Sequence, residues 1–167
     1  LTLPDRSGLH SGIRSERIYE LPLKTWRDIA GSKLGPLDLL RAPYELLRIH
    51  TRLPIMIPGR ICDSLLDWLT ATRLQPIMVI HANHANELDG EVAESLERLS
   101  RAGILLLNQS VLLSGVNDDA GTLANLSRRL IELRVQPYYL HQLDRVQGAA
   151  HFEVPVERGQ QILSQLS

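Results

Sequence analysis

From Leu46 onward, short apolar runs alternate with longer stretches in which apolar residues recur at helical spacing. This alternation constrains the fold more than any other feature, because it is typical of strand–helix units around a parallel sheet. Four such units are half of a (β/α)8 barrel, and a half cannot close on itself. The predicted fold class is α/β, with parallel βα units forming part of a TIM-like barrel; an open α/β sheet is the structural alternative.

The expected elements follow the pattern in order. Glycine or proline interrupts every periodic stretch of residues 1–45, so an irregular N-terminal segment is predicted there, with at most one helix near 24–29. Residues 46–167 form the predicted barrel domain, in which Gly103 is suited to ending a helix. Strands are expected near 46–50, 76–80, 104–113 and 135–140, and helices near 60–72, 89–102, 123–133 and 156–166.

Composition narrows the class of protein. The net charge of -1 argues against a nucleic-acid or membrane-surface binder, which usually carries a basic excess. No apolar run approaches the roughly 20 residues of a membrane span, and Pro4, Asp5 and Gly8 stand where a signal peptide is apolar. A cytoplasmic location is therefore expected. The chain starts at Leu1 without an initiator methionine, which suggests a truncated piece.

The single cysteine, Cys62, limits redox and metal chemistry. One thiol cannot form an internal disulfide, and by itself it cannot hold a structural zinc or an iron–sulfur cluster. Free cysteines tend to be buried, so Cys62 is expected to behave as a small apolar residue of the core.

Polar residues follow the predicted strands where each strand ends. In parallel α/β folds the C-terminal strand ends face one crevice, so these residues are candidates for a site. Five of the six histidines lie at or after such an end. The candidates are His50 and Arg52 after the first strand, residues 81–87 after the second, Asn117 and Asp118 after the third, and Asp144 after the fourth.

The stretch from His81 to Glu87 allows two interpretations. His81, His84 and Glu87 could bind zinc or iron, although the spacing departs from that of the two-histidine zinc helix. Alternatively, Asn83, Asn86 and Glu87 cap the following helix, a task for which histidine rings are poorly suited. We predict no metal site and expect Asn86 to be the cap.

Asn108, Gln109 and Ser110 interrupt an otherwise apolar strand. Each unpaired amide there would cost on the order of 1 to 3 kcal/mol, so these side chains must find partners. Alternation places Asn108 and Ser110 on one face and Gln109 on the other. They form either a buried polar layer between strands or a donor–acceptor pair for a polar ligand.

Charged candidates also have two interpretations each. Asp144 ends an apolar strand and needs a cationic partner, which could be the neighbouring Arg145 or the ammonium group of a substrate. Arg48, Arg52 and Arg60 could bind a carboxylate or phosphate, or could be ordinary solvated charges.

Four long segments together resemble consecutive blocks of the lysine 2,3-aminomutases, a family of radical S-adenosylmethionine enzymes. They are LRIHTRLPIMIPGRI, HANHANELD, LLNQSVLLSGVNDDAGTLANL and PYYLHQLDRVQGAAHFEVP, in the family's order over about residues 46–167. PYYLH and VQGAAHF resemble most the branch that makes (R)-β-lysine for elongation factor P. The resemblance thus implies a C-terminal fragment of a radical S-adenosylmethionine barrel and a link to the elongation factor P pathway.

The resemblance also implies cofactors and residue roles. The family uses a [4Fe–4S] cluster, S-adenosylmethionine and pyridoxal phosphate to move an amino group of lysine from the α to the β carbon. By motif, His81 and Gln109, with Asn108 beside them, match positions that contact S-adenosylmethionine. Asp144 matches the carboxylate that holds the side-chain ammonium of lysine, and His141 beside this substrate site stands where the family usually has tyrosine. No catalytic residue is assigned, and a homo-oligomer is compatible with the resemblance.

Departures from the family pattern bear on activity. The CxxxCxxC motif that holds the cluster and the SGGDP stretch before LRIHTR are missing, and the pyridoxal lysine of the family lies beyond Ser167. Lys24 and Lys33 are the only lysines, and neither has its glycine-rich context. The predicted function is a fragment of a lysine 2,3-aminomutase-like isomerase that is inactive alone. The alternatives are a non-catalytic ligand- or protein-binding half-barrel and an unrelated metal-dependent barrel enzyme.

Overall fold

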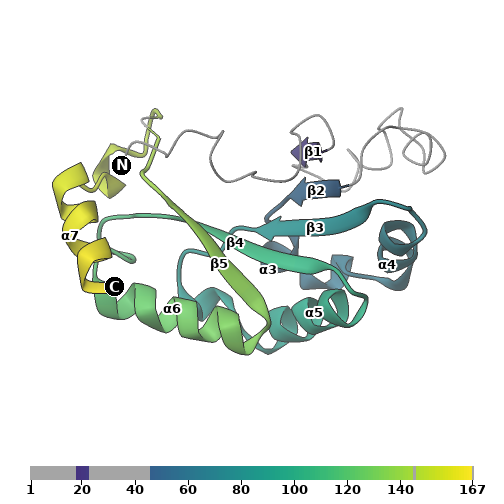
Figure 1. Cartoon of the computed structure of the whole chain (residues 1–167). Coiled ribbons are helices and arrows are strands. Elements are labelled where there is room, and N and C mark those ends of the chain that lie inside the picture. The colour runs from purple at the N-terminus through teal and green to yellow at the C-terminus, as the bar shows by residue number, and fades with distance from the viewer. Residues whose placement is uncertain (1–17, 23–45, 145, 167) are drawn as a thin grey trace.

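A computed structural model describes residues 18–22, 46–144 and 146–166, which form one parallel sheet with helices on one side (Figure 1). Neighbouring strands along the chain are neighbours in the sheet, all parallel, in the order β1-β2-β3-β4-β5. The sheet stays open, as the fold prediction allowed. Its strands are β1 (Ile18–Pro22), β2 (Leu46–His50), β3 (Gln75–Ile80), β4 (Leu105–Val111) and β5 (Val135–His141).

Strand β1 is the one described strand that the sequence analysis did not predict. Pro22 ends this strand, and a five-residue segment with Glu20 at its centre, among glycines and prolines, is too short to show a period. Strand β1 pairs with β2 from Ile18 beside Leu46 to Pro22 beside His50. This pairing, rather than any local sequence pattern, makes the segment a strand. The helix considered near 24–29 lies outside the described residues.

The predicted helices are confirmed to within a few residues. The helix expected over 60–72 begins at Asp63, and the residues before it form two short elements that were not predicted, each with a proline in its first turn. The helices are α3 (Leu53–Met56), α4 (Asp63–Thr70), α5 (Gly90–Arg101), α6 (Ala120–Glu132) and α7 (Val156–Leu166), with 3-10 turns η2 (Pro58–Arg60), η3 (Ala85–Glu87) and η4 (Ala150–Phe152).

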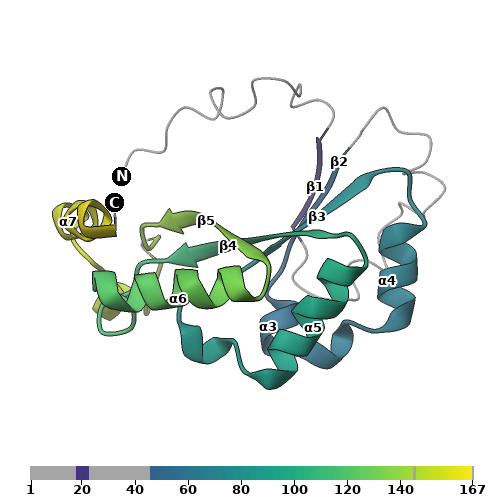
Figure 2. The same cartoon turned by 60° about the horizontal axis from the view of Figure 1, so that its bottom comes forward.

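Helices α3 to α6 lie on one side of the sheet, and their apolar stripes form the core with alternate strand residues (Figure 2). We call this covered side the outer face, and the opposite side of the sheet the inner face. In the described part of the chain, no helix covers the inner face. The strands contribute Leu47, Ile49, Met78, Ile80, Leu106 and Val135 to this core, and the helices contribute Leu65, Leu69, Val92, Leu96, Leu99, Leu126 and Leu130.

Helix ends obey local rules that the sequence displays. Asp89 caps α5 by accepting a hydrogen bond from the Val92 amide, and Asp119 caps α6 in the same way through Thr122. After α5, Gly103 adopts a positive φ of 79°, a conformation that glycine enters without steric cost. The prediction that Gly103 ends this helix is confirmed.

A side-chain bridge links β2 to β5 across two intervening strands. The Arg48 guanidinium donates a hydrogen bond to the Tyr138 hydroxyl over 2.9 Å and lies 5.3 Å from the centre of that ring. Three strand spacings separate the two backbones by roughly 14 Å in a flat sheet. Contact between the side chains therefore indicates that the inner face is concave, as in a barrel wall.

Cys62 lies half-buried at the start of α4, with its Sγ atom 3.1 Å from the Ser64 hydroxyl. It packs against the edge of the core, so it contacts apolar residues as expected but is only partly buried. The capping position, with its extended backbone, keeps the thiol near the surface. Separately, none of the helices in the described ranges combines the length and apolarity that a membrane crossing requires.

Candidate functional site

The C-terminal end of the inner face carries the candidate site. His50 ends β2, His81 follows β3 and His141 ends β5, so three imidazoles come from the same edge of the sheet. The rings of His50 and His81 meet edge to face with centroids 6.3 Å apart. The contact between His50 and His81 agrees with the expectation for adjacent parallel strands, which bring their carboxyl ends to one edge.

His81 is the most constrained of these residues. Burial lowers its pKa below the ordinary value of 6.5, and the nearby charges of His50, Arg52 and His141 lower it further. Its Nε2 atom is buried and has no hydrogen-bond partner within the described residues. A buried ring nitrogen without a partner costs free energy, and a polar group of a ligand could relieve that cost.

A β-bulge shapes the β5 side of the site. The pairing of β4 with β5 shifts between Asn108 and Gln109, so that Tyr138 is skipped and Gln109 lies opposite Tyr139. The Tyr138 and Tyr139 rings then lie 3.9 Å apart, and the Tyr139 ring is 5.5 Å from that of His141. The bulge explains how two consecutive tyrosines reach one face of the sheet.

His141 resembles His81 in its surroundings. Burial lowers its pKa, and the charge of Asp144 acts in the opposite direction with a smaller effect. Its Nε2 atom is likewise buried without a hydrogen-bond partner in the described part of the chain. Neutral imidazoles at neutral pH can donate one hydrogen bond and accept another, which suits a polar uncharged or anionic ligand group.

We expect the imidazoles of His81 and His141 to titrate below pH 6.5 in the folded protein. The unfolded chain then takes up protons first as the pH falls. The free energy of unfolding therefore decreases as the pH drops through 6.5 toward the folded pKa values, and His81→Gln removes part of this dependence. An NMR titration of the ring protons, with urea unfolding at several pH values, measures both effects. Folded midpoints above 6.5 would contradict the prediction.

Asn108 lies on the outer face, and Gln109 projects to the other side, as alternation predicted. The Asn108 side chain is 2% exposed and forms three hydrogen bonds, accepting from the Ala82 amide and donating to the Ala82 carbonyl and the Ser110 hydroxyl. The interpretation as a buried polar layer is therefore confirmed for Asn108 and Ser110. Asn108 supports the backbone that follows His81, and its predicted contact with a cofactor stays a prediction.

Asn117 is a structural residue that the sequence analysis had placed among the site candidates. Its side chain is fully buried, and its Oδ1 atom accepts from the Leu113 amide. Its Nδ2 atom donates to the carbonyls of Asn83 and Val111. Asn117 thus ties the end of β4 to the loop after His81, and only the tertiary arrangement reveals that purpose.

The His81, His84 and Glu87 metal site is not formed. The Nδ1 atom of His84 accepts a hydrogen bond from the Asn86 amide, and both carboxylate oxygens of Glu87 accept hydrogen bonds from protein groups. Within the described residues, no group of three or more histidine, cysteine, aspartate or glutamate side chains could hold a metal ion. The chain places His81 beside His50 instead, because these two follow adjacent strands.

The expected capping by Asn86 is also wrong. His84 caps the η3 turn through its Nδ1 atom, with Glu87 completing a capping box, and Asp89 caps α5. Asn83 uses its Oδ1 atom to accept from the Val111 amide of β4. The extended backbone of His84 brings its ring within reach of the amide two residues ahead, which residue preferences alone do not indicate.

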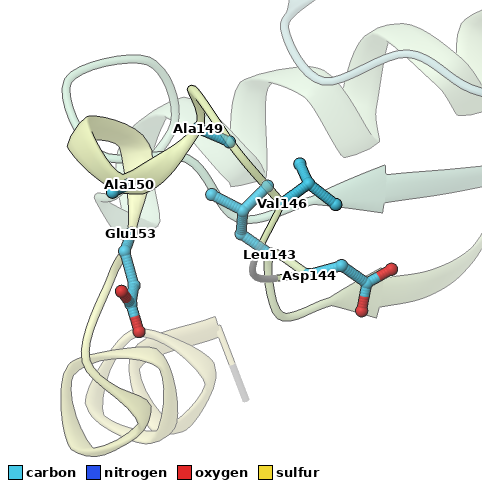
Figure 3. A pocket seen from close by; sticks show the side chains of 6 residues that line it. All are labelled: Leu143, Asp144, Val146, Ala149, Ala150 and Glu153. Atoms are coloured by element: carbon cyan, nitrogen blue, oxygen red, sulfur yellow. The ribbon is translucent and has the colours of Figure 1, made fainter.

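Asp144 lines a separate pocket beyond the end of β5, of about 140 Å³ (Figure 3). Figure 3 shows the carboxylates of Asp144 and Glu153 on opposite sides of the pocket lining, with apolar side chains between them. This pocket could accept a cation with an alkyl body. His81 and Gln109, which the resemblance assigns to S-adenosylmethionine, are not among its lining residues. The lining residues are Leu143, Asp144, Val146, Ala149, Ala150 and Glu153.

Comparisons with known proteins agree on one enzyme. The chain is 53% identical over 120 residues to L-lysine 2,3-aminomutase of Escherichia coli K12, covering 72% of this chain and 35% of that protein. It is 52% identical over 122 residues to the Haemophilus influenzae enzyme of the same name, covering 73% and 36%. Over the matched segment, the chain is a homologue of the L-lysine 2,3-aminomutases. The Clostridium subterminale aminomutase is 39% identical over 123 residues, covering 73% of this chain and 29% of that protein. No protein-family model matches.

The aminomutase homology confirms the resemblance drawn from the four sequence blocks. It does not separate the elongation factor P branch from other aminomutases, although it is consistent with that branch. The chain spans about a third of the length of the Escherichia coli and Haemophilus influenzae aminomutases. The activity, substrate and partners of a whole aminomutase therefore come to this chain only as proposals.

The described residues fit some of the cofactors of the aminomutase family and not others. The buried Nε2 atom of His81 on the inner face fits a polar ligand such as S-adenosylmethionine. A [4Fe–4S] cluster does not fit, because the sequence contains one cysteine. That residue, Cys62, lies on the helix side of the sheet, and its thiol is hydrogen-bonded to the Ser64 hydroxyl. Pyridoxal phosphate needs a lysine, and Lys24 and Lys33 both lie outside the described residues.

Proposed function

We propose that this chain is part of a cytoplasmic radical S-adenosylmethionine lysine 2,3-aminomutase-like isomerase, which converts L-lysine to β-lysine for elongation factor P and in its complete form assembles as a homo-oligomer. In this proposal His81 and Gln109 contact S-adenosylmethionine on the inner face. Asp144 and His141 bind lysine, with Asp144 accepting from the side-chain ammonium. The homology to the aminomutases and the inner-face position of His81 support the assignment.

The partnerless Nε2 atom of His81 is the single observation that carries the ligand-binding part of the proposal. It lies buried at the C-terminal strand ends, where parallel α/β folds bind ligands. A ligand atom placed there forms a hydrogen bond in surroundings from which water is largely excluded. Such a bond contributes more to affinity than one on an exposed surface.

Calorimetry with S-adenosylmethionine tests this binding. Replacing His81 with alanine is expected to weaken binding at least about tenfold, since losing a buried hydrogen bond costs on the order of 1.4 kcal/mol or more. The matched control is His151→Ala, which changes an exposed histidine on η4. Equal affinities of the wild-type chain and His81→Ala would contradict the assignment of His81.

A second candidate is a ligand-binding half-barrel without catalysis, favoured by the single cysteine. We expect the purified chain alone to be inactive, because it has no residues that fit a cluster. Anaerobic reconstitution with iron and sulfide, followed by an assay for reductive cleavage of S-adenosylmethionine, checks this expectation. A chain that holds a cluster and cleaves S-adenosylmethionine would refute the inactivity and the non-catalytic candidate together.

A further inference from the structure

Glu87 uses both carboxylate oxygens to join two strand ends. Its Oε1 atom accepts hydrogen bonds from the backbone amides of Asn83, over 2.7 Å, and His84, over 3.0 Å. Its Oε2 atom accepts from the Arg52 guanidinium over 2.5 Å. Hydrogen bonds to an ionised carboxylate are roughly twice as strong as neutral ones, so this residue is a strong local anchor.

The partner of Glu87 lies beside His81. The Thr51 amide donates to the Val79 carbonyl over 3.0 Å, which extends the pairing of β2 with β3 past the end of β2. Continuing the same register sets Arg52 level with His81. This register places the two residues side by side at the strand ends, and the charge of Arg52 contributes to lowering the pKa of His81.

The Arg52 side chain would be poorly fixed without this carboxylate. It is 47% exposed, whereas that of Glu87 is 24% exposed. A free arginine side chain is among those that lose the most conformational entropy when they are held in one place. Glu87 is itself held by the two backbone amides, so it can hold the guanidinium in one direction at little further cost.

We propose that Glu87 is a positioning residue that fixes the loop after His81 and holds the Arg52 guanidinium beside His81 at the edge of the inner face. The proposal rests on the proposed function insofar as His81 contacts a ligand. Glu87 acts through Arg52 and the loop backbone, and it does not touch the ligand. Its carboxylate therefore sets the shape and the charge of the site before a ligand binds.

The test compares Glu87→Gln, Arg52→Gln and the double variant in an NMR titration of the His81 ring, without ligand. Arg52→Gln removes a nearby cation, so the His81 midpoint moves to higher pH. Glu87→Gln keeps an acceptor for the loop amides and ends the ion pair. If Glu87 holds Arg52, the guanidinium leaves and the midpoint again rises, with no further rise in the double variant.

The sign of the Glu87→Gln effect decides the outcome. Loss of the carboxylate charge alone would lower the His81 midpoint, so a rise requires that Arg52 has moved away. An unchanged or lower midpoint would show that Arg52 stays in place without Glu87 and would overturn the proposal. Glu97→Gln, which ends the exposed pair with Arg101 on α5, is the matched control and should leave the His81 midpoint unchanged.

Two further measurements distinguish the positioning effect of Glu87 from the binding of S-adenosylmethionine. Amide exchange at Asn83 and His84 should become about fivefold faster in Glu87→Gln, because a neutral acceptor replaces a charged one. Wild-type rates there would overturn the anchoring of the loop. Binding of S-adenosylmethionine should weaken about threefold to tenfold. If the wild-type chain does not bind S-adenosylmethionine, the proposed function fails. The ligand-free titration still tests whether Glu87 holds Arg52 beside His81.

Discussion

Replacing Asn117 with alanine should lower the free energy of unfolding by about 3 to 5 kcal/mol, close to the whole stability of many small domains. The side chain is fully buried and forms three hydrogen bonds with backbone groups of Leu113, Asn83 and Val111. Truncation leaves these groups without their partner in a place that water does not readily reach. Urea unfolding followed by circular dichroism measures the change.

The control for this variant is Asn125→Ala, which removes the same amide from an exposed position on α6. It should change the free energy of unfolding by less than about 0.5 kcal/mol. A second comparison is Asn117→Asp, which keeps the acceptor but loses both donated hydrogen bonds and introduces a charge into the interior. If Asn117→Ala unfolds at the same urea concentration as Asn125→Ala, Asn117 does not tie β4 to the loop after His81.

Replacing Leu106 with alanine should lower the free energy of unfolding by about 3 to 5 kcal/mol, whereas Leu105→Ala should cost less than about 1 kcal/mol. These neighbours project to opposite faces of β4. Leu106 is 1% exposed beneath the helices, and Leu105 is 49% exposed on the inner face. Truncating Leu106 leaves a cavity in the core, while truncating Leu105 removes a side chain that is already half in water.

This matched pair tests the assignment of the two faces as well as the packing. Both substitutions remove the same atoms from consecutive residues of one strand, so strand propensity contributes equally to the two results. Urea midpoints and slopes should be compared under identical conditions, because unequal slopes would indicate a change in the unfolded state. Equal losses for the two variants would mean that the inner face is covered as well as the outer face.

The sheet and its helices could be predicted because burial imposes a period on the sequence. Strand β2 begins and ends as predicted, and the Leu123, Leu126 and Leu130 stripe of α6 was visible as a row of leucines. Strand β1 could not be predicted in this way. It is held by pairing with β2, a partner more than twenty residues away, and five residues are too few to display a period.

The candidate site was predicted in outline and corrected in detail. Residue order showed that polar groups follow the strands, so the gathering of His50, His81 and His141 was expected. It could not show that Asp144 lines a different pocket with Glu153, because that depends on the path of the chain after β5. It also could not show that Glu87 is occupied by Arg52 and two amides, which removes it from any metal site.

The sequence by itself determined the fold class, the order of the βα units and the kinship with the aminomutases, since these depend on periodicity and on long runs of residues. Only the tertiary structure decided the purpose of each polar side chain. Asn83, Asn108 and Asn117 have the same chemistry as a ligand-binding amide, and the hydrogen bonds that make them structural come from residues as far as 34 positions away. A buried amide binds whichever partner the fold brings within 3 Å, and sequence spacing does not encode that distance.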